Sequence, residues 1–543
     1  MAKDSLLKGT LILSVAALVA RVLGIAQRVP LVYLLGTAGS VMFAQANNVY
    51  LMLLPLATAG IPSALSKLVS EKIALGQREQ AEHIYRASIR FAIIAGIVIT
   101  VPMFIAAPYY ADYVKVQGSA LSIRAIAPAL LLFPVIAMMR GYFQGRQMMM
   151  AGGISQIVEQ FARVATSVGF AAIFLWAGSG EDWIAAGASF GGVMGAVGAF
   201  AVMMYYMRKL RRSDYAALRE TAAASESVKA SGLPAMSTKA IYKALLSLSI
   251  PIVIFSSAVA IVYFIDSFAI RLIESQVGLE MATKQYGWLA YQAQSLAGIP
   301  VIFATAISQS LVPVISSAFA GRDMAEVGRK ASLALRLAVL SGLPVILVIC
   351  TAAAPINALL FTSSDGWELT TLLTAGTIFQ ILMMTSGAIL MGMGRMKPLV
   401  GFVLAGIAVK IVGTVVLSQW FGMYGVVAAT ALCFITASTL NIAYLRKEVP
   451  FTILGSRWPG LIASILVISA VGGGAAYFGL EWLQPFGQLK LDALLQTLVV
   501  GGLAGALYPF MLMATRVVTK EDIATFPAPI RKLIGKVQRL LGR

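Results

Sequence analysis

Charged residues are scarce in this chain and make up 12% of its 543 residues, about half of the roughly 25% found in soluble globular domains. An ordinary soluble surface therefore cannot be built from it. The single histidine, His83, excludes most histidine-based catalysis and most metal sites. The two cysteines, Cys350 and Cys433, lie inside apolar runs, so we expect neither a disulfide framework nor a metal centre.

Apolar residues, in contrast, account for 59% of the chain. A helix that crosses about 30 Å of hydrocarbon needs about 20 mostly apolar residues. Fourteen runs meet this requirement, at residues 7–34, 41–70, 88–111, 121–144, 153–177, 183–207, 243–273, 285–318, 330–353, 367–393, 398–420, 423–445, 456–480 and 490–516. The first run is too long and too polar for a cleaved signal peptide, so we expect it to be retained. The pattern predicts an all-α polytopic membrane protein with about fourteen transmembrane helices.

The net charge of +19 is distributed unevenly between the two sides of the predicted membrane protein. If the N-terminus lies inside, 32 of the 42 lysines and arginines fall on inside segments, 4 fall on outside loops, and 6 fall within helices. Cytoplasmic segments of membrane proteins carry such an excess. We therefore expect both termini in the cytoplasm, beside anionic lipid head groups, and no binding of nucleic acid.

The chain carries an internal repeat. The sequence Ala-Gly-Ile-Pro at 59–62 recurs at 297–300, and Gly-Arg at 145–146 recurs at 394–395. Each unit holds six predicted helices, so both copies enter the membrane from the same side, as in parallel-repeat transporters. We expect an N-terminal lobe at 1–212, a cytoplasmic linker at 213–242, a C-terminal lobe at 243–447, two further helices within 448–516, and a basic tail at 517–543. The tail has the apolar spacing of a helix on the inner membrane surface, with a frayed basic segment as the alternative.

Ionised side chains within the predicted helices are the candidate functional residues, because each costs at least ~2.5–3.5 kcal/mol at the bilayer centre. Arg21 and Arg28 lie on one face of the first helix, and their guanidinium groups suit an anionic head group. Alternatively, Arg21 pairs internally and Arg28 extends to the interface. Lys67 lies four residues before Glu71, a spacing that permits a local ion pair.

Glu159 and Arg163 have the same spacing in the fifth helix, and here we favour a structural, self-neutralised pair. Asp266 and Lys410 lie in the seventh and eleventh helices and have no opposite charge nearby on their own helices. Arg271 is five residues from Asp266, well round the helix. Asp266 and Lys410 are therefore candidates for a conformation-dependent pair or an ion-coupled site, or for a permanent structural pair.

The summed charge of these helix positions is positive, which suits a phosphate or pyrophosphate better than an organic cation. Helix-breaking residues occur at matching places in the two repeats, where the substrate path of such proteins runs. They are Pro55, Gly60 and Pro62 in the second predicted helix and Gly298 and Pro300 in the eighth. Simple packing kinks are the alternative.

Four stretches of the sequence resemble a known family. They are Arg21-Val-Leu-Gly24 with Arg28, residues 60–71, Arg140-Gly-Tyr-Phe-Gln-Gly145, and Ser155-Gln-Ile-Val-Glu159-Gln-Phe-Ala-Arg163-Val. The chain resembles the stage V sporulation protein B-like polysaccharide transporters, of the superfamily that includes MurJ-type lipid II flippases and multidrug exporters. The resemblance implies fourteen helices, two six-helix lobes, and a central cationic cavity that flips an undecaprenyl-linked sugar precursor by alternating access.

The resemblance also implies roles for particular residues. Arg21 matches a cavity arginine of the family; Gln27 stands where MurJ-type proteins have a second arginine, and Arg28 follows it; Gln294 and Ser295 stand near the place of a third. Asp266 matches an acidic residue of a sodium site in some members, and Lys410 lies where that site would need neutral or acidic ligands. The ammonium group of Lys410 would then replace the ion.

The sequence thus predicts a flippase for an undecaprenyl-pyrophosphate-linked cell-wall or polysaccharide precursor, located in the bacterial cytoplasmic membrane. We expect a monomer without a cofactor, driven by H⁺ or Na⁺ coupling or by the membrane potential. The substrate-binding candidates are Arg21, Gln27, Arg28, Lys67 and Gln294, and the coupling or ion-pair candidates are Glu159, Arg163, Asp266, Arg271 and Lys410. The alternatives are a multidrug exporter of the same fold or a membrane-embedded polyprenyl-dependent transferase.

Overall fold

The computed structural model describes residues 6–58, 61–224, 237–479 and 487–518. Within these ranges the chain is helical and contains no strand, which confirms the predicted all-α class. Eleven of the described helical segments are long and apolar enough to cross a membrane. The predicted tail beyond Val518 and the central part of the predicted linker lie outside the described residues.

The chain divides into two compact units, residues 1–271 and 272–543, which we describe separately. The helices of the first unit are α1 (Leu6–Thr58), α2 (Ile61–Ala74), α3 (Arg78–Tyr113), α4 (Ser119–Ile126), α5 (Ala129–Gly145), α6 (Met149–Trp176), α7 (Glu181–Ala224) and α8 (Thr238–Asp266). Helix α9 (Ala269–Val277) spans the boundary. The predicted lobe boundaries stay a prediction.

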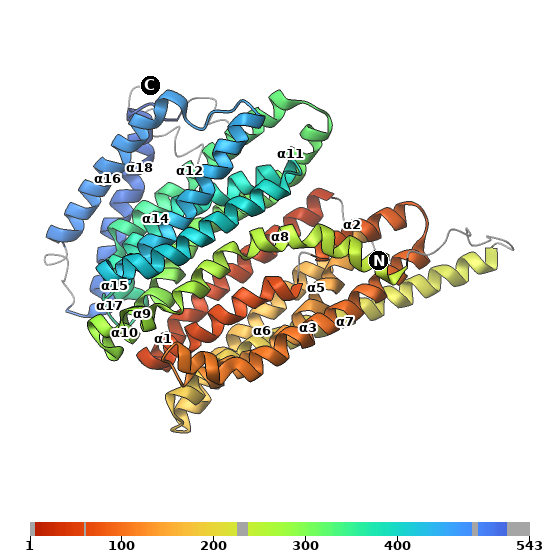
Figure 1. The fold of residues 1–543 in the computed structure, drawn as a ribbon, viewed down its shortest axis with the longest axis horizontal. Helices are drawn as coiled ribbons and strands as arrows, with labels where there is room; N and C mark the ends of the chain where they lie inside the picture. Colours follow the sequence, from red (N-terminus) through yellow and green to blue (C-terminus); the bar gives the residue numbers. More distant parts are fainter. Residues whose placement is uncertain (1–5, 59–60, 225–236, 480–486, 519–543) are drawn as a thin grey trace. The chain divides into compact units, whose positions relative to one another are not determined.

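The second unit contains α10 (Leu279–Gly287), a π-helical turn η1 (Trp288–Ala293), α11 (Gln294–Ala320), α12 (Met324–Thr351), α13 (Ala353–Leu360), α14 (Trp367–Gly392) and α15 (Met396–Glu448). It continues through a short 3₁₀ turn η2 (Gly455–Arg457), α16 (Trp458–Gly479), α17 (Leu489–Gln496), a second π turn η3 (Thr497–Gly501) and α18 (Gly502–Ala514). Helices α16 and α18 pack side by side in this unit (Figure 1).

Two of the helical segments are each made of two helices joined at a glycine. Helix α1 is interrupted at Gly36 (φ 63°) and α15 at Gly422 (φ 54°), and a positive φ is a conformation that glycine adopts without a steric penalty. In α15 the chain folds back on itself, because Gly406 faces Cys433 and Gly413 faces Ala429. With these divisions and α11, the described part of the chain is compatible with fourteen transmembrane helices.

Close helix packing in the first unit depends on small residues spaced four apart. A Cβ atom on Gly141 of α5 would lie 2.6 Å from the carbonyl oxygen of Pro62, and one on Gly145 would lie 2.7 Å from that of Ser66. The two glycines therefore let α5 approach the backbone of α2. On α7, Gly195 permits the same approach to α6, where its Cβ would lie 2.8 Å from the Glu159 carbonyl oxygen.

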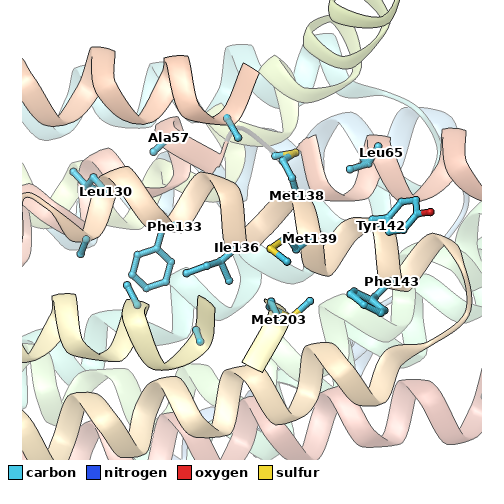
Figure 2. Close-up of a cluster of buried hydrophobic side chains, with 14 of the residues drawn as sticks. Ala57, Leu65, Leu130, Phe133, Ile136, Met138, Met139, Tyr142, Phe143 and Met203 are labelled. Carbon is cyan, nitrogen blue, oxygen red and sulfur yellow. The ribbon is translucent and has the colours of Figure 1, made fainter. Parts of the chain in front are cut away.

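The apolar face of α5 forms the centre of the first unit's core. Figure 2 shows Phe133, Ile136 and Met139 of α5 gathered with Leu65 of α2 and Met203 of α7. All five side chains are buried. The polar stretch of α5 that follows, from Arg140 to Gly145, is held between α2, α6 and α7 by this packing and by the two glycines.

The predicted breaks in the helices lie in different surroundings. In the first unit α1 ends at Thr58 and α2 begins at Ile61, and Gly60 lies outside the described residues. In the second unit Pro300 lies inside α11, seven residues after the end of the π-helical turn η1, which is about two helical turns. A π turn in a helix is frequently found at a functional site.

Candidate functional site

Three ionised side chains meet inside the first unit, and we call Arg140, Glu159 and Arg163 the arginine cluster. Arg140 Nη2 donates to Glu159 Oε2 at 2.9 Å, and Arg163 Nη2 lies 3.6 Å from Glu159 Oε1. The side chains of Arg140, Glu159 and Arg163 are 24%, 13% and 20% exposed. Two guanidinium groups therefore share one carboxylate, which leaves the cluster with an excess of one positive charge.

Helix geometry and neighbouring side chains hold the arginine cluster in place. Glu159 and Arg163 are one turn apart on α6, so they share a face. Ser155, one turn earlier, accepts hydrogen bonds from Nε and Nη2 of Arg140 at 3.3 and 2.9 Å and donates to the Ala199 carbonyl oxygen of α7 at 3.3 Å. Three helices, α5, α6 and α7, thereby fix the orientation of the Arg140 fork.

Arg163 contacts two aromatic rings in addition to the carboxylate. Its Nη2 donates to the Tyr50 hydroxyl at 3.3 Å, and its guanidinium carbon lies 5.7 Å from the centre of the Tyr50 ring and 5.9 Å from that of Phe133. These distances are within the range of cation–π attraction. Within the described residues, the Nε atom of Arg163 is buried and has no hydrogen-bond partner, so one donor of the group is unsatisfied.

The position of Arg163 along α6 raises the free-energy cost of its charge in a membrane. Arg163 lies fourteen residues after Met149, the first residue of α6. At 1.5 Å per residue this is about 21 Å along the helix, halfway along its 28 residues and therefore well inside a hydrocarbon layer about 30 Å thick. An uncompensated charge at that depth costs several kcal/mol, so it is retained in a sequence only where it has a partner or a function.

The two coupling candidates of the sequence, Asp266 and Lys410, are both fully buried. Asp266 ends α8, and a turn at 267–268 separates it from α9. The carbonyl oxygen of Ser267 in this turn accepts a hydrogen bond from Gln45 Nε2 at 3.1 Å, and the Tyr110 hydroxyl donates to Gln45 Oε1 at 2.9 Å. Polar side chains of α1 and α3 thus satisfy the interrupted backbone in the first unit.

Lys410 connects the two halves of the α15 hairpin. Its Nζ donates to the Val426 carbonyl oxygen at 2.9 Å and to Thr430 Oγ1 at 2.8 Å. Both acceptors lie beyond the Gly422 turn, whereas Lys410 lies before it. The ammonium group therefore joins the two helices of the hairpin by hydrogen bonds. Its pairing with Asp266 stays a prediction.

The remaining candidates lie in several different environments. Gln27 and Gln294 are buried, Arg28 is half-buried, and Lys67 is exposed. Lys67 and Glu71 form no ion pair in the part of the chain that the structure describes. Arg271 is exposed, donates to the Tyr113 carbonyl oxygen at 3.3 Å, and stacks 4.4 Å above the Tyr113 ring.

The side chain of Arg21 lies outside the described residues. The structure thus brings together Glu159 and Arg163 among the candidates of the sequence, and it adds Arg140 and Tyr50, which sequence reasoning missed. Arg140 is 19 residues from Glu159, and Tyr50 is 113 residues from Arg163. The presence of Arg140 and Glu159 in two neighbouring family-like stretches was the one signal that could have paired them.

Comparisons with known proteins agree with this architecture. A family profile described as "Polysaccharide biosynthesis protein" matches residues 6–319. The lipid II flippase MurJ of Bacillus subtilis (strain 168) is 25% identical over 521 residues, which are 93% of either chain. Stage V sporulation protein B of the same organism is 24% identical over 546 residues, covering 98% of this chain and all of the relative.

Solved structures show the same fold. The lipid II flippase MurJ in an inward closed conformation matches with a TM-score of 0.63 at 13% identity, covering 94% of this chain and all of that one. A multidrug resistance MATE transporter of the MOP superfamily, in its inward-facing conformation, matches with a TM-score of 0.59 at 14% identity, covering 78% and 97%. The chain therefore belongs to the polysaccharide biosynthesis protein family and has the membrane fold of the MOP superfamily.

Proposed function

We propose that this protein flips an undecaprenyl-pyrophosphate-linked cell-wall or polysaccharide precursor across the bacterial cytoplasmic membrane. The observation that carries the proposal is the excess positive charge of the arginine cluster at membrane depth. A self-neutralised pair of Glu159 and Arg163 would serve structure alone. The addition of Arg140 leaves one charge that a pyrophosphate is suited to neutralise, because a guanidinium fork matches phosphate oxygens.

The relatives support this substrate class. A protein named lipid II flippase and a sporulation protein both align with nearly the whole chain. A multidrug exporter of organic cations would instead need carboxylates and aromatic faces toward its substrate. The arginine cluster has the opposite charge, so we rank the exporter function second and propose no enzymatic reaction.

In the proposed mechanism, Arg21 and Arg28 receive the pyrophosphate, and the buried amides of Gln27 and Gln294 hydrogen-bond its sugars or phosphates. The exposed Lys67 would contribute to capture. The polyprenyl tail stays in lipid, since its transfer into a polar cavity would expose apolar surface to water. Alternating access between the proposed lobes at 1–212 and 243–447 then changes the side to which the head group is open.

We propose that the driving force acts on charge. A membrane potential of 100 mV contributes about 2.3 kcal/mol for each elementary charge that crosses, and a potential that is negative inside favours outward movement of an anion. Asp266 and Lys410, both fully buried, are the proposed coupling residues, with H⁺ or Na⁺ as the alternative source of energy. Arg271 is the proposed neighbour of this pair. The proposed protein is a monomer with both termini in the cytoplasm.

Reconstitution into vesicles tests the proposal. Labelled lipid II and a simpler polyprenyl-diphosphate sugar are compared by the access of each head group to a membrane-impermeant reagent. Arg21→Ala is expected to abolish translocation without loss of folded protein. Arg163→Lys keeps the charge but removes the guanidinium fork, and we expect at least a tenfold slower rate.

The matched control is Arg208→Lys, because Arg208 is exposed and lies outside the arginine cluster. Wild-type rates for Arg21→Ala and Arg163→Lys would refute the assignment of these arginines to the substrate path. Transport of organic cations with no movement of either glycolipid would support the multidrug exporter instead.

A further inference from the structure

The first unit contains a second polar site, which is lined by no member of the arginine cluster. A cavity of about 870 Å³ opens there between the first turns of α3, the α5–α6 connection and the C-terminal part of α7. Four arginines line it: Arg78 and Arg86 of α3, Arg146 of the α5–α6 connection, and Arg211 of α7. Three carboxylates, those of Glu79, Glu82 and Asp214, face the same space.

One wall of the cavity is a fixed ion-pair network. Arg146 donates from Nη1 and Nη2 to the two carboxylate oxygens of Asp214 at 2.7 and 2.8 Å, a bidentate arrangement that joins the α5–α6 connection to α7. Arg146 Nη1 also donates to the Tyr142 hydroxyl at 3.2 Å, and that hydroxyl donates to Glu82 Oε2 at 3.2 Å. Figure 2 places Tyr142 at the edge of the hydrophobic cluster.

The pKa of Arg146 also indicates that its guanidinium group is engaged in this ion-pair network. Partial burial acts to lower the pKa of Arg146, but the hydrogen bond to Asp214 and the neighbouring Tyr142 outweigh it and raise the pKa above its ordinary value. Arg146 and Asp214 neutralise each other. The binding capacity of the cavity therefore rests on the other three arginines.

These three guanidinium groups have N–H donors that make no hydrogen bond among the described residues. Arg86 makes one hydrogen bond, from Nε to Glu82 Oε1 at 3.2 Å, and Arg211 approaches the same oxygen only to 3.8 Å; their side chains are 66% and 59% exposed. Among the described residues, the side chain of Arg78 has no hydrogen-bonding or ion-pair partner, and its backbone N–H donates to the Gly76 carbonyl oxygen at 3.0 Å. The first turn of α3 adds the positive end of a helix of 36 residues, whose cap residue Gln77 makes no side-chain hydrogen bond to it.

The length of α7 places this cavity at the level of lipid head groups. Helix α7 runs for 44 residues, about 66 Å at 1.5 Å per residue. Arg211 lies thirty residues after Glu181, or about 45 Å along the helix, whereas a bilayer with its head groups is about 40–45 Å thick. Phosphate groups are concentrated at that depth, on the side that the charge distribution predicts is cytoplasmic.

We propose that this cavity binds a phosphate-bearing ligand, held by Arg78 and Arg86 of α3 and Arg211 of α7. The ligand's phosphate is either the head group of an anionic membrane lipid or a soluble phosphate compound. Bound there, it bridges the first turns of α3 to the distal part of α7. The site is independent of the proposed flippase function, since none of these three residues belongs to the arginine cluster or to the proposed substrate path.

The test measures binding of two probes to the full chain in an alkyl maltoside, a detergent that contains no phosphate. Inorganic pyrophosphate is titrated by calorimetry, and phosphatidylglycerol is titrated by native mass spectrometry with phosphatidylcholine as the comparison lipid. The variant Arg78→Gln/Arg211→Gln removes two donors from the cavity. The control Arg90→Gln/Arg212→Gln removes the same charge at two exposed positions that do not line it.

We expect at least one probe to bind, with a Kd that rises tenfold or more in the cavity variant and less than threefold in the control. Pyrophosphate binding identifies a soluble ligand and selective phosphatidylglycerol binding identifies a lipid; both outcomes support the site. Absence of binding by both probes, or equal weakening in the two variants, overturns it. If the double variant fails to fold, binding of the same probes is measured with Arg78→Gln alone. That side chain has no hydrogen bond or ion pair with the described part of the protein, so its replacement is expected to leave the fold intact.

Discussion

Glu159→Gln is the substitution that most directly tests the reading of the arginine cluster. Glutamine has nearly the same shape as glutamate, so the change removes the charge and little else. It weakens the 2.9 Å hydrogen bond from Arg140 and removes the attraction on Arg163 at 3.6 Å. The two guanidinium groups then face each other without a counter-ion.

The expected cost follows from the burial of the three side chains. Breaking a fully buried ion pair by removing one partner costs about 3–5 kcal/mol. The side chains of the arginine cluster keep between 13% and 24% exposure, so we expect the lower limit, about 3 kcal/mol. For a domain of this size about 1 kcal/mol corresponds to roughly 2–4 °C, which gives a fall in Tm of about 6–12 °C.

The assay is thermal unfolding of the purified protein at a fixed scan rate, extended to a double-mutant cycle. Glu159→Gln/Arg140→Gln restores the original net charge, so it is expected to be less destabilised than the sum of the two single variants by about 1–2 kcal/mol. Two results would show that the carboxylate does not balance the two arginines. One is a double variant whose loss of stability equals the sum of the losses in the single variants; the other is a decrease in Tm of less than about 2 °C for Glu159→Gln.

Two further substitutions test the packing and capping of the helices. Gly141→Ala puts a Cβ atom 2.6 Å from the Pro62 carbonyl oxygen and is expected to cost about 1–3 kcal/mol by overpacking; Gly401→Ala, where a Cβ meets nothing within 4 Å, is the control and is expected to be neutral or stabilising. Lys490 donates to the carbonyl oxygens of Ala358, Leu359 and Phe361 at the end of α13, so Lys490→Met is expected to cost about 1–2 kcal/mol and to raise hydrogen exchange over 353–361. Lys397→Met, at an exposed position, is its control, and equal exchange in the two variants would refute the capping role.

The sequence by itself determined the class of the protein. Continuous apolar runs of about 20 residues indicate helices in a membrane, because a helix of that length crosses the hydrocarbon layer and satisfies its own backbone hydrogen bonds. The spacing of Glu159 and Arg163 likewise fixed that they share a helix face. Such properties depend on residues close together in the chain, so they can be read without knowledge of the fold.

Only the tertiary structure decided which partners these residues meet. Arg140 joins the pair from another helix, and its arrival changes a neutral pair into a cluster with excess charge. Lys410 finds its acceptors across the Gly422 hairpin. The cavity beside α3 depends on how far α7 extends past its neighbours. Contacts between helices depend on how side chains pack and on where glycines let two backbones approach. They join residues far apart in the sequence, so no local sequence pattern predicts them.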